Sequence, residues 1–68
     1  MSTTASYSIV GMTCQHCVAS VTEELSEIAG VTAVDVDLDT GIANVTSDAP
    51  LEQEQVQTAV NEAGYELG

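Results

Sequence analysis

Two cysteines carry the chemistry that this 68-residue sequence offers, and they stand three positions apart as Cys14 and Cys17. They lie in the segment GMTCQHC, residues 11–17, and the chain holds no other cysteine. Two sulfurs separated by two residues can point at one small ion or at each other. The spacing therefore leaves three possibilities: a structural disulfide, a redox pair or a metal site.

The two disulfide interpretations are less favoured. A fixed bridge across so short a loop removes little entropy from the unfolded chain, and the reducing cytoplasm disfavours disulfides. A redox pair would gain from a helix N-terminus, whose partial positive charge stabilises a thiolate. The segment around the cysteines lacks the aromatic and proline residues usual in the active-site turn of the longer thioredoxin-like units. A dithiol redox protein remains the alternative from a different class.

For a metal site, the donor set favours Cu(I). Two thiolates are soft donors that suit a soft monovalent ion in near-linear geometry, whereas structural zinc takes four ligands. His16 is the only imidazole of the chain. On an ideal helix it lies about 100° around from Cys17, so it could not join the pair without loop rearrangement. An open two-sulfur site can also hand its ion over by ligand exchange.

The composition excludes several other functions. The chain has no Lys or Arg and 11 Asp and Glu residues, giving a formal net charge of −11. Without cationic side chains, we expect neither nucleic acid nor anionic lipid as a partner. A chain this short forms one domain, residues 1–68, with too little core for a two-lobed catalytic cleft, so we expect no enzyme. Neither a membrane span nor a secretory signal is visible, which predicts a cytoplasmic protein.

The charge balance also indicates the salt concentration in which the protein works. Ordinary cytoplasmic proteins interleave both signs of charge. In more than 1 M salt the screening length falls below about 3 Å, so like charges on a small surface stop repelling one another. The sequence therefore indicates a salt-accumulating halophile, and an acidic surface aimed at a basic partner is the rival explanation.

Hydrophobic periodicity in the first half predicts a strand and a helix on either side of the cysteines. Residues 7–10 alternate as a short strand that ends at Gly11, and residues 12–16 form a loop. From Cys17, apolar residues recur at steps of three and four, which predicts an amphipathic helix that closes at Ala29-Gly30. The apolar positions of this helix are Val18, Val21, Leu25 and Ile28.

The second half predicts a hairpin, a helix and a last strand. Residues 34–39 alternate valine or leucine with aspartate, and residues 39–41 form a tight turn. Residues 42–46 follow as a second strand, with Ala43 and Val45 facing inward. Ser47 or Asp48 is expected to cap a helix with Ala49-Pro50 in its opening turn, and Gly64 ends it. Its apolar positions are Leu51, Val56, Ala59, Val60 and Ala63.

Residues 65–67 leave room only for a short strand, which completes the order βαββαβ. This order is typical of an α+β, ferredoxin-like sandwich: a four-stranded antiparallel sheet with both helices on one face. The longest loop would carry both cysteines, as expected of a functional loop on a rigid scaffold.

The segment GMTCQHC resembles the metal loop of the heavy-metal-associated (HMA) domain family, which includes small copper chaperones and amino-terminal domains of copper-transporting P-type ATPases. The resemblance covers essentially the whole chain, including the domain length, the element order and Ala63-Gly64-Tyr65 after the second helix. It implies that Cys14 and Cys17 are the Cu(I) ligands, with Cys14 the more mobile.

The family pattern also suggests roles around the cysteines. Met12 is similar to a methionine beneath the metal loop, and we interpret it as core filler. Thr13 stands where zinc- and cadmium-exporting relatives commonly carry an acidic residue, which favours copper. His16 matches a position where many bacterial chaperones carry His that could shield copper or tune exchange, with a role-free exposed His as the alternative. Tyr65 would contact the site or serve core packing.

The resulting hypothesis is a standalone cytoplasmic Cu(I) metallochaperone that delivers copper to a copper-transporting P-type ATPase or a copper-responsive regulator. A homodimer bridged by copper through four thiolates is possible. An excised ATPase domain and an HMA domain for another soft metal such as Hg(II) are nearby alternatives. The absence of Lys argues against electrostatic steering to a partner, so docking would rely on packing around the metal loop.

Overall fold

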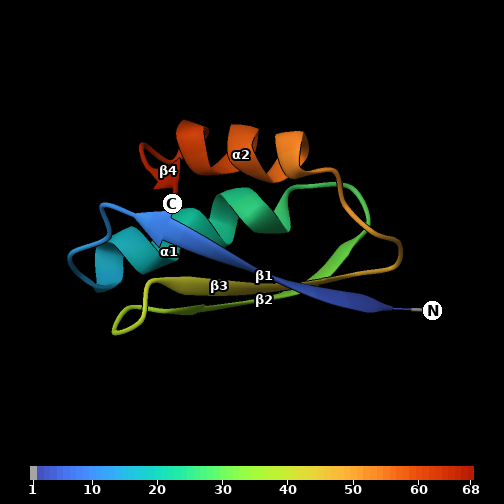
Figure 1. The fold of residues 1–68 in the computed structure, drawn as a ribbon, viewed down its shortest axis with the longest axis horizontal. Helices are drawn as coiled ribbons and strands as arrows, with labels where there is room; N and C mark the ends of the chain where they lie inside the picture. The colour runs from blue at the N-terminus through green and yellow to red at the C-terminus, as the bar shows by residue number, and fades with distance from the viewer. Residues whose placement is uncertain (1) are drawn as a thin grey trace.

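Strands and helices follow one another in the predicted βαββαβ order in the computed structural model, which describes residues 2–68. The elements are β1 (Thr3–Val10), α1 (Gln15–Ser26), β2 (Val31–Asp37), β3 (Ile42–Ser47), α2 (Gln53–Glu62) and β4 (Glu66–Leu67). Both helices lie on the same side of the sheet (Figure 1). The ferredoxin-like fold class is therefore confirmed.

The four strands form one antiparallel sheet in the order β2-β3-β1-β4. In the register between β1 and β3, Tyr7 lies opposite Ala43, and between β1 and β4, Ile9 lies opposite Leu67. Strand β1 pairs with β3 over Thr3–Ser8 and with β4 at Ile9 and Val10, so the loop that follows it begins at a residue that is held by the sheet.

The core fills the space between the sheet and the two helices. Its buried hydrophobic residues are Ile9, Val21, Leu25, Ala43, Val45, Val56, Ala59 and Val60. Ala43 and Val45 face inward as predicted. On the opposite sheet face, the Ser6 hydroxyl donates to Asn44 Oδ1 over 2.6 Å. Polar side chains that pair across strands therefore occupy this face, whereas the helices pack on the other face.

Two strands begin earlier than predicted. Strand β1 starts at Thr3 instead of Tyr7, because Thr3 to Ser6 pair with β3 even though their side chains give little hydrophobic signal. Strand β2 starts at Val31 instead of Val34, with an irregularity in its pairing between Val31 and Ala33 that breaks the alternation. Strand β2 also ends at Asp37, whose carboxylate accepts the Asp39 N–H over 2.9 Å and so begins the turn.

The predicted cap of the second helix was wrong. Helix α2 is capped by Glu52, not by Ser47 or Asp48, and Glu52 and Gln55 form a reciprocal capping box. Ser47 is instead the last residue of β3, where it is buried and its hydroxyl donates to the Ala49 carbonyl over 2.6 Å. Ala49-Pro50 thus lies before the helix.

The helix ends differ in how well they were predicted. Gly64 follows the α2 C-cap with φ of +94°, and the Tyr65 N–H beyond it donates to the Val60 carbonyl over 3.0 Å, so the predicted stop is confirmed. Helix α1 ends at Ser26, earlier than the predicted closure at Ala29-Gly30.

No helix among residues 2–68 is long and apolar enough to span a bilayer.

Leu25 supports the packing of α1, and thus of the cysteine loop, because it is fully buried. Replacing Leu25 by Ala is expected to lower the free energy of unfolding by about 2–5 kcal/mol, from lost apolar burial and a residual cavity. Urea denaturation followed by circular dichroism measures the change. Val10→Ala is the matched control, since Val10 is 53% exposed. Equal losses in the two variants would contradict this account of the core.

Candidate metal site

The first turn of α1 brings the two cysteines together. Cys14 is the N-cap, with φ −157° and ψ 173°, and its carbonyl accepts N–H bonds from Cys17 at 3.1 Å and Val18 at 3.3 Å. The helix therefore starts at Gln15, and the prediction that Gln15 and His16 belong to the loop was wrong. The two residues between the cysteines form the first helical turn, which places both sulfurs at the N-terminal end of α1.

The sulfur atoms lie 3.5 Å apart, and both thiols are free. This distance is far beyond a disulfide bond of about 2.05 Å but shorter than two metal–thiolate bonds of about 2.3 Å each. One ion can therefore contact both sulfurs after a small opening of the pair. Cys14 is exposed and Cys17 is half-buried, so Cys14 is the sulfur that a partner reaches first.

In the part of the chain that the structure describes, the two sulfurs are the donor set. Among residues 2–68, no group of three or more His, Cys, Asp and Glu side chains is arranged to hold a metal ion. His16 is exposed on the first turn of α1. A four-ligand zinc site is thus not assembled within this part of the chain.

The surroundings of Cys17 favour its thiolate. The pKa of Cys17 is lowered from 9.0 to about 6, chiefly by hydrogen bonding from the Thr13 backbone, then from the Tyr65 and Cys14 side chains. The pKa of Tyr65 is raised because its hydroxyl is held by Cys17 and because it is partly desolvated near both sulfurs. The first turn of α1 also contains no acidic residue to offset the positive end of the helix dipole.

Tyr65 and Gly11 hold the cysteine loop against the body of the protein. Gly11 has φ of +102°, and a Cβ atom there would lie 3.2 Å from Cδ1 of the Tyr65 ring. A larger residue would be strained by its backbone and would also press on the ring. The sequence suggested a strand end at Gly11, but only the fold reveals its contact with a tyrosine from the other end of the chain.

The remaining predicted site residues fall into two groups. Thr13 belongs to the site, with its hydroxyl oxygen 3.8 Å from the Cys17 sulfur. Met12 is half-buried and packs against the core, as expected of core filler. Tyr65 both packs against the core and reaches Cys17, so its two suggested roles are compatible. His16 is not among the side chains that the fold brings to the sulfurs.

Comparison with known proteins defines the class. Residues 6–66 match the heavy-metal-associated domain family, so the chain belongs to that family. The match includes the end of β1, the cysteine loop and both helices, which are the elements that build the site.

Relatives within this family carry copper-related names. The chain is 43% identical over 60 residues to a COP-associated protein of Helicobacter felis, covering 88% of this chain and 91% of the relative. It is 37% identical to the copper chaperone CopZ of Bacillus subtilis, covering 87% of each. A solved CopZ metallochaperone superposes with a TM-score of 0.89 at 31% identity, over 97% of this chain and all of the other.

The same fold also occurs in a copper-binding domain of a P-type ATPase. A copper-binding domain from HMA7, a P-type ATPase, superposes with a TM-score of 0.86 at 29% identity, covering 96% of this chain and 89% of that domain. Copper chaperones of this type are therefore related to the HMA domains of copper ATPases.

The hydrogen bonding at Cys17 can be tested by titration. In a Cys14→Ser background, which isolates Cys17, iodoacetamide alkylation should rise with pH to a midpoint well below 9, because the Thr13 backbone and Tyr65 still stabilise the thiolate. Adding Tyr65→Phe removes one of these donors and should move the midpoint to higher pH. An unchanged midpoint in the Tyr65→Phe variant would show that the tyrosine hydroxyl does not support the thiolate.

Proposed function

We propose that this chain is a Cu(I) metallochaperone, a non-enzymatic protein that takes up copper on Cys14 and Cys17 and passes it to another dithiol protein. The observation that carries the proposal is the reduced sulfur pair, 3.5 Å apart at the N-terminus of α1, with Cys14 exposed. Membership of the heavy-metal-associated family and the copper-related names of its relatives support it.

The geometry suits transfer by ligand exchange. A partner thiolate approaches from the exposed side and forms a bond to copper as the Cys14–copper bond breaks. Cys17, whose thiolate is stabilised by Thr13 and Tyr65, keeps its bond until a second partner thiolate replaces it. Copper stays Cu(I) throughout and each bond formed replaces one broken, so no oxidant or reductant is required.

The donor set supports copper over harder metals. Two soft thiolates suit Cu(I), and within residues 2–68 no third His, Cys, Asp or Glu side chain joins them. Thr13 supplies a hydroxyl where an acidic residue would add a hard ligand. Hg(II) is the nearby alternative, since it is equally soft. Affinity for Zn(II) should be orders of magnitude lower.

We further propose that the chain works in the cytoplasm with residues 1–68 acting as one domain. The receiver of copper would be a copper-transporting P-type ATPase or a copper-responsive regulator. The likeness to the copper-binding HMA7 domain supports the first of these, because donor and receiver would then share one fold. A pair of these loops also offers four thiolates, so copper could bridge two copies of this chain.

A competition titration with Cu(I) against a chromogenic chelator tests the site. The wild type should bind one Cu(I) per chain or per pair, and Cys14→Ser or Cys17→Ser should abolish tight binding because one thiolate remains. His16→Ala is the matched control in the same turn and should still bind copper, with altered exchange at most. Tight binding in both cysteine variants would refute this site.

The same titration separates the chaperone from the dithiol redox alternative. The 3.5 Å sulfur separation would also permit a reversible disulfide after a small movement. A redox protein would cycle between dithiol and disulfide near the cytoplasmic potential and act without metal. Absence of tight Cu(I) binding combined with such cycling would support that alternative.

We also propose that the protein works in molar salt. Its 11 carboxylates have no Lys or Arg to oppose them, and the pKa of Glu24 is raised by its partial desolvation and then by Glu27, Glu62 and Glu23. This repulsion destabilises the folded state in dilute buffer and is screened by salt.

Salt dependence of stability checks this environment. The midpoint of urea unfolding should rise as KCl increases from 0.1 to 2 M, because screening removes repulsion among the carboxylates. Glu24→Gln should raise stability in 0.1 M KCl and have less effect in 2 M KCl, since Glu24 faces like charges. A flat dependence on KCl in the wild type would argue against a halophilic origin.

A further inference from the structure

Most of β1 borders an unpaired edge of the sheet. Strand β4 pairs with β1 only at Ile9 and Val10. The Gly68 N–H adds one bond to the Ser8 carbonyl over 2.8 Å. Among residues 2–68, no strand lies on this side of β1 along Thr3–Tyr7, which we call the open edge. Figure 1 shows β4 next to the arrowhead of β1, while the rest of the strand runs on without it.

The open edge presents backbone groups that another strand can bind. The Ile9 N–H donates to the Gly41 carbonyl over 2.7 Å, on the β3 side, whereas the Ser8 carbonyl faces β4. Because the bonding direction alternates along a strand, Thr4 and Ser6 direct their N–H and C=O groups to the same side as Ser8. The surface there is hollowed by about 270 Å³, and this hollow is lined by Ser6, Tyr7, Ser8, Gln53, Leu67 and Gly68.

The side chains of β1 do not block pairing along the open edge. Proteins commonly protect an edge strand with charged side chains, proline or a bulge. Strand β2, at the other edge of the sheet, has exposed Asp35 and Asp37 and an irregularity in its pairing between Val31 and Ala33. Strand β1 contains no charged residue and no proline, and its register with β3 is unbroken. Only the β2 edge is therefore protected in this way.

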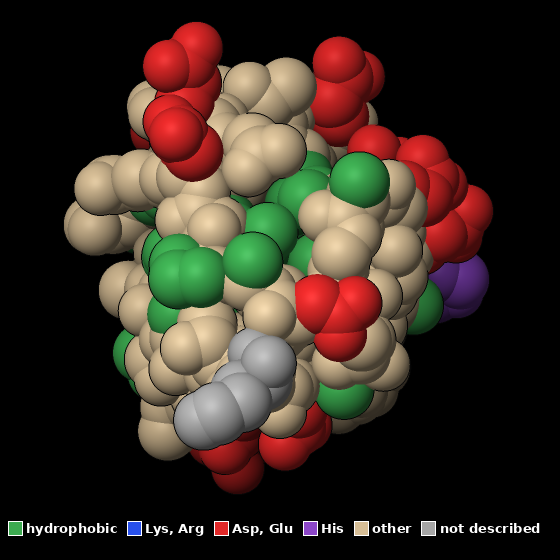
Figure 2. Space-filling model, turned by 90° about the vertical axis from the view of Figure 1, so that its right-hand side faces the viewer, with side chains coloured by type: hydrophobic (Ala, Val, Ile, Leu, Met, Phe, Trp, Pro, Cys, Tyr) green, Lys and Arg blue, Asp and Glu red, His purple; other side chains and the backbone are tan. Residues whose placement is uncertain are grey.

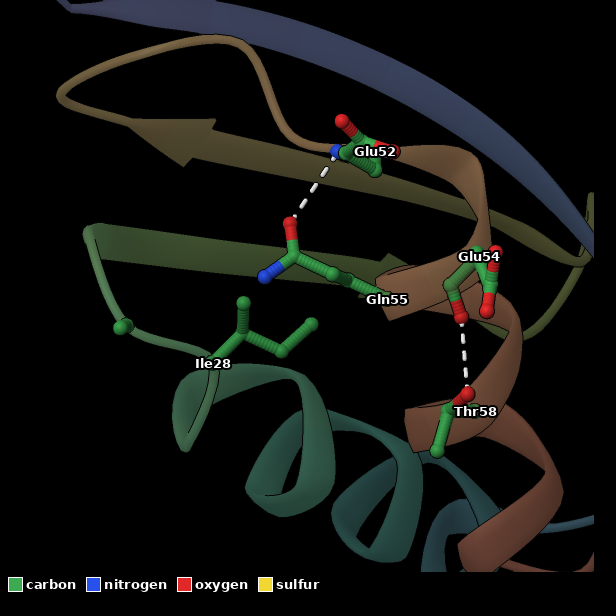
Figure 3. A pocket seen from close by; sticks show the side chains of 6 residues that line it. Ile28, Glu52, Glu54, Gln55 and Thr58 are labelled. Carbon is green, nitrogen blue, oxygen red and sulfur yellow. Dashed lines mark hydrogen bonds between the residues drawn. The ribbon is translucent and has the colours of Figure 1, made fainter.

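Charge determines which surface of this protein suits a second copy. Each chain has a net charge of −11, so two copies repel wherever their carboxylates face each other. Figure 2 shows carboxylates on several sides of the molecule. The groove between the end of α1 and the start of α2 is one such surface, and Figure 3 shows Ile28 beside Gln55 there, with Glu52 and Glu54 above them. The side chains of the open edge are neutral, so two copies meet there with little repulsion.

We propose that two copies of this chain pair through their open edges as antiparallel strands, which joins their sheets into one. The same surface of each copy contacts the other, with Thr4 and Ser6 exchanging main-chain hydrogen bonds across the pair. These bonds involve no ion pair, and salt screens the repulsion between the two acidic chains. The cysteine loops follow the opposite ends of the paired strands, so both loops stay uncovered.

Sedimentation equilibrium tests the pairing on metal-free protein. The Cys14→Ser/Cys17→Ser double variant excludes both a copper bridge and a disulfide between copies. At millimolar protein in 2 M KCl, the measured mass should be twice that of the 7.0 kDa chain, and association should be weaker in 0.1 M KCl. A mass of one chain in 2 M KCl would overturn the proposal and leave the open edge to an extended segment of another protein.

Hydrogen exchange locates the contact within β1. The N–H groups of Ala5 and Tyr7 face β3 and should be protected at every protein concentration. Those of Thr4 and Ser6 should exchange rapidly in dilute protein and severalfold more slowly at millimolar protein in 2 M KCl. A dimer in which Thr4 and Ser6 gain no protection would contradict pairing through the open edge.

Two variants of Ser6 separate the backbone contact from the side chain. Ser6→Pro removes the N–H at the open edge, where proline is tolerated, and should weaken association about tenfold or more because both copies lose a bond. Ser6→Ala loses the same hydroxyl bond to Asn44 but keeps the N–H, so it should associate like the parent. Equal association of two folded variants would refute the proposal. If Ser6→Pro does not fold, the exchange at Thr4 and Ser6 still decides.

Discussion

The start of α1 at Cys14 is the constraint on which the site depends. The Cys14 carbonyl accepts the first helical N–H bonds from Cys17 and Val18, which commits both cysteines to one turn. The helix itself is held by Val21 and Leu25, fully buried between it and the sheet. The packing of Val21 and Leu25, which begins two helical turns after Cys14, therefore determines where the sulfurs lie.

The two helix N-termini are used in different ways. Helix α2 begins with Glu52 and Glu54, whose carboxylates offset the positive end of its dipole and satisfy its free N–H groups. Helix α1 has a cysteine as its N-cap and no acidic residue in its first turn. Its positive end is thus left to favour thiolates. The first acidic residue of the whole chain is Glu23, so the segment that forms the metal loop is free of carboxylates.

Prediction from the sequence was strong where a pattern repeats and weak where a boundary depends on pairing. The spacing of Val21 and Leu25 and the alternation of Ala43 and Val45 identified core positions correctly. Strand β1 extends to Thr3 because β3 lies beside it, and the segment Thr3–Ser6 lacks the hydrophobic alternation from which a strand is predicted. Ser47 looked like a cap, but its burial in β3 left the capping of α2 to Glu52.

The sequence by itself determined the chemistry that is available: two thiols at a helix-compatible spacing, one imidazole and no cationic side chain. Residue types and their periodicity are local properties, so no fold is needed to read them. The tertiary structure decided the 3.5 Å separation of the sulfurs, the contact between Tyr65 and Gly11, and the groove between the end of α1 and the start of α2. Tyr65 meets Gly11 because β4 pairs with β1 at Glu66 and Val10, and Ile28 lies beside Gln55 (Figure 3) because both helices pack on one face of the sheet (Figure 1). Tertiary packing thus joins residues that are distant in the chain.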